Sequence, residues 1–393
     1  MSIFTAVMTG KGAGAISTVQ VFGKDCEGLV ARIFKPAGTK PAKFNANEIL
    51  LGAITDGDRT IDQVTIGCET QDTFAIHCHG NPLVVEMIMQ LLDRCGVTLL
   101  TAEQLLAKIF TSAEPASTIA VEAKLAQLRA ETIQGTKIIA NQIDAGLGEE
   151  ARNWLANIDE TSLAEIRAEA AKILQGSQVA KLIIYGCTAV LTGPPNSGKS
   201  TLLNRLAGRQ KAIVTDIKGT TRDWVEATCK IGPLCLRLID TAGLDEELPN
   251  CQDNINEAAR KKTIEILEQA DLILLVLDSS RPADEYDDRL SRRIGDKRVV
   301  TVLNKSDLPA KFDVNELPQT LSNTVRIGAT EGAGIEDLKE EIQRILGTPD
   351  FDLHQAVCFT DRQENLLREL QKVKSKLQAA SIITELLKGR LRV

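Results

Sequence analysis

Gly193-Pro-Pro-Asn-Ser-Gly198-Lys199-Ser200 is the stretch of this sequence that decides the fold. It matches the pattern G-x-x-x-x-G-K-S/T at every defined position. An apolar run at residues 188–192 precedes it and a helix-forming run at residues 201–206 follows it, so it is predicted to join a buried strand to a helix. Glycine lets backbone N–H groups turn inward around phosphates, and a helix N-terminus adds partial positive charge. The sequence therefore predicts a phosphate-binding loop, in which Lys199 reaches the β- and γ-phosphates and the Ser200 hydroxyl binds Mg²⁺.

Two further motifs are predicted to serve the magnesium ion and the γ-phosphate. Asp240-Thr-Ala-Gly243 follows an apolar run. Its Asp240 is expected to hold Mg²⁺ through water, and its Gly243 N–H to contact the γ-phosphate. Thr215-Asp-Ile-Lys-Gly-Thr220-Thr221-Arg-Asp223 lies between this motif and the phosphate loop, as a switch loop does. A threonine of such a loop completes the magnesium shell, and Thr221 is predicted to be that threonine.

Two more motifs are predicted to contact the base of the nucleotide. Asn304-Lys-Ser-Asp307 ends the apolar run at residues 298–303. The Asp307 carboxylate can accept hydrogen bonds from guanine N1–H and the exocyclic amine, a pattern that adenine does not offer, so GTP is predicted over ATP. Gly328-Ala-Thr330 stands where a third base-contacting loop belongs, with the Ala329 N–H facing guanine O6.

The predicted nucleotide-binding residues are Gly193, Asn196, Ser197, Gly198, Lys199, Ser200, Thr201, Thr215, Thr220, Thr221, Asp240, Thr241, Ala242, Gly243, Asn304, Lys305, Asp307, Gly328, Ala329 and Thr330.

Hydrophobic periodicity divides the chain into four segments. Residues 186–350 alternate continuous apolar runs with helical patterns, which is typical of a parallel sheet covered on both faces. Residues 101–185 and 351–393 repeat apolar residues at helical spacing. Residues 1–100 mix short strand-like runs with a helix at 82–94. The predicted fold is an α/β P-loop GTPase domain inserted in an α-helical domain, preceded by a small α+β domain.

Composition sets limits on partners and compartment. The net charge is −7, so an RNA contact needs a local basic patch. The six basic residues near the C-terminus fit either a solvated helix face or a contact with RNA: they are Lys372, Lys374, Lys376, Lys388, Arg390 and Arg392. Nine cysteines form no CxxC pair, as expected of reduced thiols. With no leader-like start and no long apolar run, we expect a cytoplasmic protein without a membrane contact.

The motifs together resemble the MnmE family of tRNA modification GTPases. The resemblance is carried by the phosphate loop, by Ala212-Ile-Val-Thr-Asp-Ile-Lys-Gly-Thr-Thr-Arg-Asp223 and by Asp240-Thr-Ala-Gly-Leu244. Thr360-Asp-Arg-Gln363 resembles the family's return to its helical domain, and Cys78-His79-Gly80 resembles its His-Gly-Gly turn. The resemblance implies an N-terminal folate-binding dimerisation domain, a homodimer, a flavoprotein partner like MnmG, and tRNA as substrate.

The resemblance also implies a potassium-dependent mechanism. Related GTPases orient water with a glutamine where this chain has Leu244. In the family, a K⁺ ion bound when two GTPase domains meet supplies the missing charge. The residues that match its ligands are Asn196, Thr215, Ile217 and Thr220. An asparagine at the first of these positions also occurs in GTPases that potassium does not drive.

Several positions depart from the family pattern. Counting back from Glu268 places Asn256 where the family has its water-positioning glutamate, and a shift of one residue would place Glu257 there. These two and Thr221 are the candidate catalytic residues. At two positions of the folate pocket the residues differ: this chain has Gln20 where the family has an arginine, and Ala75 where the family has a glutamate.

A Pro-Gly-Glu-Phe-Thr segment and the family's C-terminal Cys-Ile-Gly-Lys are not found, so folate binding and the thiol chemistry are expected to be lost. The chain is then either a shortened, diverged family member or a paralogue that keeps only the switch. Three functions remain open. The chain could be a GTP hydrolase of tRNA modification or a regulatory GTP-binding module with weak hydrolysis. It could also be a ribosome-assembly GTPase, which would need a basic RNA-binding domain where only residues 351–393 follow.

Overall fold

The computed structural model describes residues 2–10, 12–38, 43–112, 117–208, 225–240, 265–282 and 297–389. The chain divides into two compact units, residues 1–121 with 390–393, and residues 122–389. None of the helices in the described ranges is long and apolar enough to cross a membrane.

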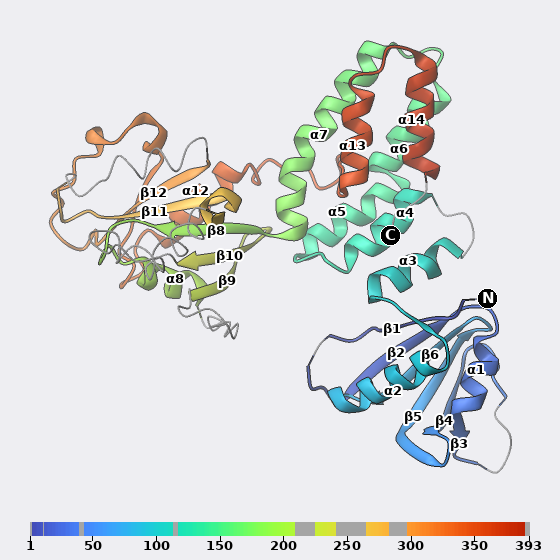
Figure 1. The fold of residues 1–393 in the computed structure, drawn as a ribbon. Helices are drawn as coiled ribbons and strands as arrows, with labels where there is room; N and C mark the ends of the chain where they lie inside the picture. Colours follow the sequence, from blue (N-terminus) through green and yellow to red (C-terminus); the bar gives the residue numbers. More distant parts are fainter. Residues whose placement is uncertain are drawn as a thin grey trace, which may run out of the picture. The chain divides into compact units, whose positions relative to one another are not determined.

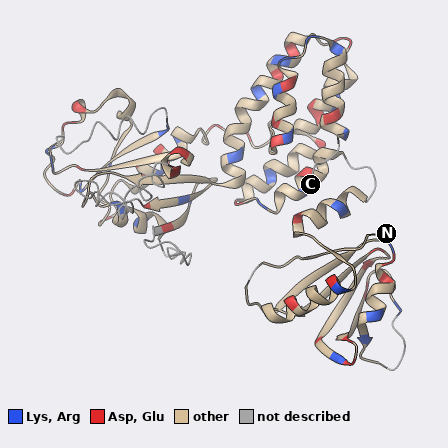
Figure 2. Ribbon diagram, in the orientation of Figure 1, with Lys and Arg blue, Asp and Glu red and all other residues tan. Residues whose placement is uncertain are grey.

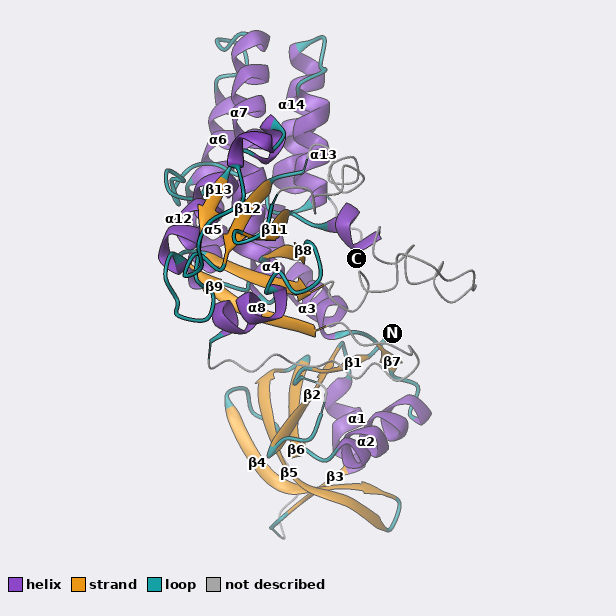
Figure 3. Ribbon diagram, turned by 90° about the vertical axis from the view of Figure 1, so that its left-hand side faces the viewer, coloured by secondary structure: helices purple, strands orange, loops and turns teal. Residues whose placement is uncertain are grey.

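A mixed sheet with two helices on one face forms the first unit. Among the described residues this sheet has seven strands in the order β3-β4-β5-β6-β2-β1-β7, with neighbours antiparallel except β1 and β7. The strands are β1 Phe4–Val7, β2 Ile16–Phe22, β3 Phe34–Pro36, β4 Glu48–Asp56, β5 Arg59–Thr70, β6 Thr73–His79 and β7 Thr98–Leu99. Helices α1 Cys26–Ile33 and α2 Pro82–Arg94 cover the face that holds the core (Figure 3).

Helix α2 begins where the sequence predicts. Pro82 occupies the first turn, and the Asn81 side chain accepts a hydrogen bond from Leu83 N at 2.9 Å. The predicted α+β character of this region is confirmed, while the short α1 was not predicted because Gly28 interrupts its apolar spacing. Two more helices follow, α3 Ala102–Ser112 and α4 Thr118–Gln127.

A second sheet carries the phosphate loop. In the part of the chain that is described it has six strands, ordered β13-β12-β11-β8-β10-β9 and parallel except for the β9–β10 hairpin. The strands are β8 Cys187–Thr192, β9 Val225–Ile231, β10 Leu234–Asp240, β11 Leu272–Asp278, β12 Val299–Asn304 and β13 Thr324–Arg326. Helices α8 Lys199–Ala207 and α12 Ile335–Leu346 belong to the same region, with short turns η2 Val314–Glu316 and η3 Gln319–Leu321. The apolar runs at residues 188–192, 234–239, 272–277 and 298–303 predict four of these strands, β8, β10, β11 and β12, to within a residue at each end.

Helices that are far apart in sequence pack together in this unit. Three of them precede the second sheet, α5 Ile133–Asp144, α6 Gly146–Ala156 and α7 Leu163–Tyr185. Two follow it, α13 Asp361–Leu370 and α14 Lys376–Lys388. Helix α13 packs against α7 and α14, and α14 packs against α6 (Figure 1). The segments before and after the nucleotide-binding region therefore share one helical layer.

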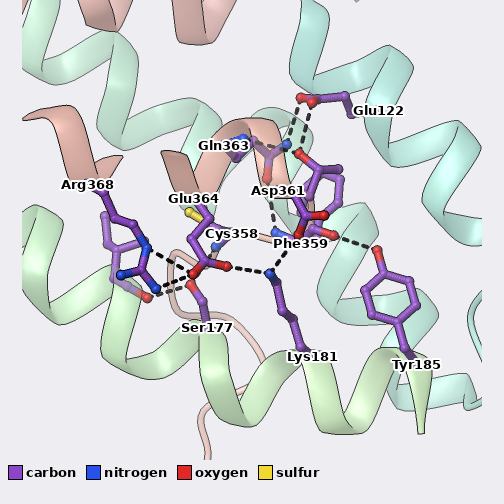
Figure 4. Close-up of polar contacts among 12 residues, drawn as sticks. Glu122, Ser177, Lys181, Tyr185, Cys358, Phe359, Asp361, Gln363, Glu364 and Arg368 are labelled. Carbon is purple, nitrogen blue, oxygen red and sulfur yellow. Dashed lines mark hydrogen bonds and ion pairs between the residues drawn. The ribbon is translucent and has the colours of Figure 1, made fainter. Parts of the chain in front are cut away.

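The segment that leads back into these helices is held by side chains. Residues 355–359 belong to no helix or strand. Val357 N donates to Gln142 Oε1 at 3.0 Å, and Cys358 N donates to Ser177 Oγ at 2.7 Å. Phe359 N donates to Gln363 Oε1 at 3.0 Å (Figure 4). Side chains of three helices thus satisfy buried backbone donors that a helix or strand would otherwise satisfy.

The Thr360-Asp-Arg-Gln363 motif organises a buried carboxylate. Glu122 is 4% exposed and accepts hydrogen bonds from Thr360, Arg362 and Gln363 at 2.8–2.9 Å. Thr360 also caps α13 by accepting from the Gln363 N–H at 3.3 Å. A buried charge is tolerated when it is paired and fully hydrogen-bonded, so this motif fixes the start of α13 on α4.

Candidate nucleotide-binding site

The loop at residues 193–198 joins β8 to α8, as the sequence predicts. Gly193 has φ 140° and Gly198 has φ 95°. A Cβ atom on Gly193 would lie 2.1 Å from Val276 O, and one on Gly198 would lie 2.2 Å from Asn304 Nδ2. Both positions require glycine, because any side chain would collide with the ends of neighbouring strands.

Lys199 begins α8 and turns its side chain back over the loop. Its Nζ donates to Gly193 O at 2.7 Å and to Pro194 O at 3.0 Å. The side chain is buried. The Lys199 ammonium group therefore lies against the loop backbone, beside the N-terminus of α8. Both the ammonium charge and the helix N-terminus favour a phosphate group here.

Two predicted magnesium ligands are brought together. Ser200 Oγ donates to Asp240 Oδ2 at 2.6 Å. The contact arises because β10 runs parallel to β8, with Asp240 in register with Leu191 at the carboxyl end of the sheet. A hydroxyl and a carboxylate oxygen are the donor types that Mg²⁺ prefers, so these residues fit the ion.

Ser197 supplies an independent sign that the loop takes a polar ligand. Its hydroxyl is buried, and within the described part of the chain it makes no hydrogen bond. Buried hydroxyl groups are nearly always satisfied in native proteins. A phosphate group bound in the loop would supply the acceptor that this hydroxyl needs.

Asn304 joins the phosphate loop to the base loops. Its Nδ2 donates to Ser197 O at 2.8 Å, and its Oδ1 accepts from Ala329 N at 3.1 Å. The side chain is 3% exposed. The carboxamide therefore ties the phosphate loop, 107 residues earlier in the sequence, to the base loop 25 residues later.

The remaining base-contacting residues lie in two adjacent loops. A Cβ atom on Gly328 would stand 3.8 Å from Asp307 Oδ1, so the two predicted base-reading motifs meet. Ser306 N donates to Ile327 O at 3.0 Å and fixes this approach. Thr330 O accepts from Arg205 Nη2 at 3.1 Å, which anchors the second loop on α8.

Other predicted site residues are placed less completely. Asn196 is exposed with φ 62°, a left-handed conformation that asparagine tolerates. Thr201 lies in the first turn of α8. The predicted residues that fall outside the described ranges are Thr215, Ile217, Thr220, Thr221, Thr241, Ala242, Gly243, Leu244, Asn256 and Glu257.

Sequence reasoning did not single out Asp278 and Ser279, which support the base loop. Asp278 Oδ2 accepts from Lys305 Nζ at 2.6 Å, and Ser279 Oγ donates to Lys305 O at 3.2 Å. A signal was present: Asp278 ends an apolar strand, as Asp240 and Asn304 do. Polar residues at the carboxyl ends of parallel strands meet at one edge of the sheet.

In the first unit, the two positions compared with the folate pocket lie side by side. Gln20 on β2 is in register with Ala75 on β6. The Gln20 amide donates to Glu69 Oε2 at 3.0 Å. At the position where the family has an arginine, this chain therefore has the Gln20 amide, which is hydrogen-bonded to the Glu69 carboxylate.

Two family models match the chain. One, described as the 50S ribosome-binding GTPase, matches residues 188–305. The other, described as the GTP-binding protein TrmE N-terminus, matches residues 3–104. The first spans β8 to Lys305 and so includes the phosphate loop, Asp240 and Asn304, while the second spans the mixed sheet of the first unit.

Curated relatives match over most of the chain. The tRNA modification GTPase MnmE of Streptococcus agalactiae is 32% identical over 375 residues, which cover 86% of this chain and 80% of that protein. MnmE of Natranaerobius thermophilus is 30% identical, covering 95% of this chain and 88% of that protein. MnmE of Acetivibrio thermocellus is 28% identical, covering 92% of this chain and 86% of that protein.

Proposed function

We propose, because the chain belongs to the MnmE family of tRNA modification GTPases, that it couples GTP hydrolysis to the modification of tRNA. The chain binds GTP and hydrolyses it to GDP and phosphate, as a GTPase of this family. The proposal is carried by one observation: a site joining the phosphate loop, Asp240 and Asn304 lies in a chain that matches these relatives over both units. The regulatory module with weak hydrolysis is not favoured by these relatives.

In the proposed site, the chain's own groups hold the triphosphate. Backbone N–H groups of the loop and the Lys199 ammonium neutralise phosphate charge. Ser200 and Thr221 would hold Mg²⁺ directly, and Asp240 would hold it through water. When bound, the ion would supply positive charge to the β- and γ-phosphates. The Ser200–Asp240 contact supports this arrangement, since the two oxygen ligands are already adjacent.

For the base, we propose that Asp307 reads guanine and that Ala329 N–H faces O6. The position of Gly328 beside Asp307 supports this pairing of loops. The Ala329 N–H donates to Asn304 Oδ1 at 3.1 Å, so guanine O6 would have to share or replace this hydrogen bond. Guanine would donate hydrogen bonds to the Asp307 carboxylate, which adenine would leave unpaired.

For the chemical step, we propose that K⁺ takes the place of an arginine finger. Asn196 is exposed at the loop, in a position to supply a side-chain oxygen. Thr215, Ile217 and Thr220 would complete the ligand set, with Thr221 and either Asn256 or Glu257 acting on the attacking water. Charge supplied at the leaving oxygen accelerates phosphoryl transfer.

The first unit is proposed to make a homodimer. Ile49 and Leu51 on β4 are 73% and 63% exposed, on the sheet face opposite to the core. An aspartate at each position should lower the apparent mass measured by analytical ultracentrifugation. An unchanged mass would place the dimer contact elsewhere.

We further propose that this unit has lost tight folate binding. Gln20 carries no charge to pair with a folate carboxylate, and its amide is already bonded to Glu69. Titration calorimetry with 5-formyltetrahydrofolate should give no tight binding. Low-micromolar affinity would contradict this.

The domain organisation is proposed to follow the sequence. A GTPase domain at residues 186–350 would be inserted between helical parts at 101–185 and 351–393, after an N-terminal domain at 1–100. The packing of α13 on α7 supports the insertion. A tRNA substrate and a flavoprotein partner like MnmG would place the reaction in the cytoplasm. Lys and Arg are interspersed with Asp and Glu along α7, α13 and α14 (Figure 2), as on solvated helix faces, and the proposed tRNA contact rests on the family alone.

The test is complementation of a bacterial strain that lacks its own MnmE. Mass spectrometry of tRNA nucleosides should show wobble-uridine modification restored by this chain and not by its Lys199→Ala variant. Hydrolysis of GTP by the purified chain, with tRNA left unmodified in the strain, would separate the GTPase from the proposed pathway and overturn the coupling.

A further inference from the structure

Asp278 lies beside the base loop although no motif includes it. It is the last residue of β11, in register with Asn304 at the end of β12. The side chain is 7% exposed. Its position at the carboxyl edge of the sheet puts a buried carboxylate next to the residues that would hold guanine.

The contacts of Asp278 divide between its two oxygens. Oδ1 accepts from Ser280 N at 3.0 Å and from Ser280 Oγ at 2.7 Å. Oδ2 accepts from Lys305 Nζ at 2.6 Å and lies 3.6 Å from Arg281 Nε. The serine contacts fix the orientation of the carboxylate, so that Oδ2 is held toward Lys305.

Lys305 needs such support, because its backbone is strained. It has φ 61°, a left-handed conformation that is costly for a lysine. Its ammonium group is held by Asp278, and its carbonyl oxygen accepts from Ser279 Oγ at 3.2 Å. Ser279 N donates to Asn304 O at 2.9 Å, which fixes the preceding residue as well. Asp278 and Ser279, at the end of β11, therefore hold residues 304–305 through three contacts.

We propose that Asp278 is a positioning residue for guanine nucleotide, which acts by locking Lys305 so that Asn304 and Asp307 present a preformed base pocket. The inference rests on the proposed role of the Asn304-Lys-Ser-Asp307 loop in guanine binding. Preorganisation of this kind raises affinity by reducing the ordering that the ligand must impose. Among the described residues, the hydrogen bonds and ion pairs of Asp278 go to Ser280, Arg281 and Lys305, so its effect belongs to binding rather than to the chemical step.

The ionisation of Asp278 is consistent with this role. Burial alone would raise the pKa of its carboxyl, but hydrogen bonds from Lys305 and Ser280 bring the pKa below its ordinary value. The carboxylate is therefore charged at neutral pH, and the contact with Lys305 is an ion pair.

The test compares Asp278→Asn with Asp271→Asn. Asp271 directly precedes β11, and its Oδ2 accepts from Thr188 N at 2.8 Å, so the two variants each remove one carboxylate, just before the strand and at its end. In stopped-flow release of a fluorescent GDP analogue, Asp278→Asn should dissociate about tenfold faster, since a charge-assisted hydrogen bond is lost. The KM for GTP should rise with little change in kcat. Asp271→Asn should behave as wild type in both assays.

A double-mutant cycle with Lys305→Met separates the outcomes. If Asp278 acts through Lys305, Asp278→Asn should add little in the Lys305→Met background. Should Asp278→Asn fold poorly, Ser279→Ala removes only the contact to Lys305 O and should give a smaller increase in the release rate.

Unchanged release in Asp278→Asn, or additive effects in the cycle, would overturn the inference. If neither Lys305→Met nor Asp307→Asn weakens GDP binding, the proposed role of the loop itself fails.

Discussion

The phenol of Tyr185, the last residue of α7, donates a hydrogen bond of 2.5 Å to the carbonyl oxygen of Phe359. Gly186 and β8 follow Tyr185 directly, while Phe359 comes two residues before α13. This single contact therefore joins the point where the chain leaves its helices to the point where it returns. Burial raises the pKa of Tyr185 to about 12, so the phenol remains a donor across the working pH range.

Removing this donor should destabilise the helical layer. Tyr185→Phe leaves the Phe359 carbonyl without its side-chain donor, and we expect the free energy of unfolding to fall by about 1–2 kcal/mol. Urea denaturation followed by circular dichroism measures the change. GTP hydrolysis at saturating substrate should be unaffected, because the contact lies outside the nucleotide site. An unfolding midpoint equal to that of wild type would show that water replaces the phenol.

Stability should depend on pH through Glu364. Hydrogen bonds from Lys181 and Arg368 hold the pKa of this carboxyl below its ordinary value of 4.5. A carboxyl with a lowered pKa in the folded state stabilises fully above its unfolded pKa, and this contribution is lost as pH falls through the folded pKa. The stability difference between wild type and Glu364→Gln should be constant from about pH 6 to 8 and shrink below about pH 4.5. A difference that grows on acidification contradicts the assignment.

Triphosphate binding should depend on the two residues that begin α8. Lys199→Ala removes the charge held at Gly193 O, and Ser200→Ala removes the partner of Asp240. We expect each change to abolish tight GTP binding in equilibrium dialysis with Mg²⁺, because phosphate charge is no longer neutralised. Ser200→Ala should retain more GDP than GTP affinity. Wild-type GTP affinity in either variant would remove the phosphate loop from the site.

Base selectivity should follow Asp307. Asp307→Asn replaces an acceptor with a donor, which suits xanthine O2 and repels the guanine amine. Competition with a fluorescent nucleotide should show GDP binding weakened by roughly tenfold or more and XDP binding improved. The wild type should discriminate strongly against ADP. Equal affinity for ADP and GDP in the wild type would be incompatible with a base-reading carboxylate.

Hydrolysis should respond to the monovalent cation. Single-turnover rates in K⁺ should exceed those in Na⁺ at matched ionic strength and should rise with protein concentration, because two GTPase domains must meet. Asn196→Ala should reduce the ratio of the two rates while GDP affinity stays close to wild type. Identical rates in both salts, at every protein concentration, would mean that the Asn196 position is structural only.

The sequence predicted elements whose pattern is local. Strands β8, β10, β11 and β12 were predicted because mainly apolar runs without regular polar alternation are typical of parallel strands buried on both faces. Strand β9 was missed, since its exposed and buried residues alternate next to the turn at Gly232 and its start adjoins an ambiguous switch sequence. The phosphate loop was predicted because its glycines and Lys199 act through neighbouring residues.

Features built from distant residues could not be predicted. Nothing local to Val357 or Cys358 indicates that Gln142 and Ser177, about two hundred residues earlier, satisfy their N–H groups. Asp278 does end an apolar run, but its role depends on which strand becomes the neighbour of β11. Only the sheet order places it beside Lys305.

The packing of α13 on α7 has a consequence for protein engineering. Insertions are tolerated best where the two ends of the host chain already lie together, since the guest then imposes no strain. Tyr185 and Phe359 form such a pair of ends. A short glycine-rich linker could therefore close the helical host, or another protein with adjacent termini could be inserted into it. In either design Gln142, Ser177 and Gln363 should be kept, because they hold residues 357–359 in place. In such a design the helices would serve as the host domain, and the region between Tyr185 and Phe359 would be the insert that is replaced.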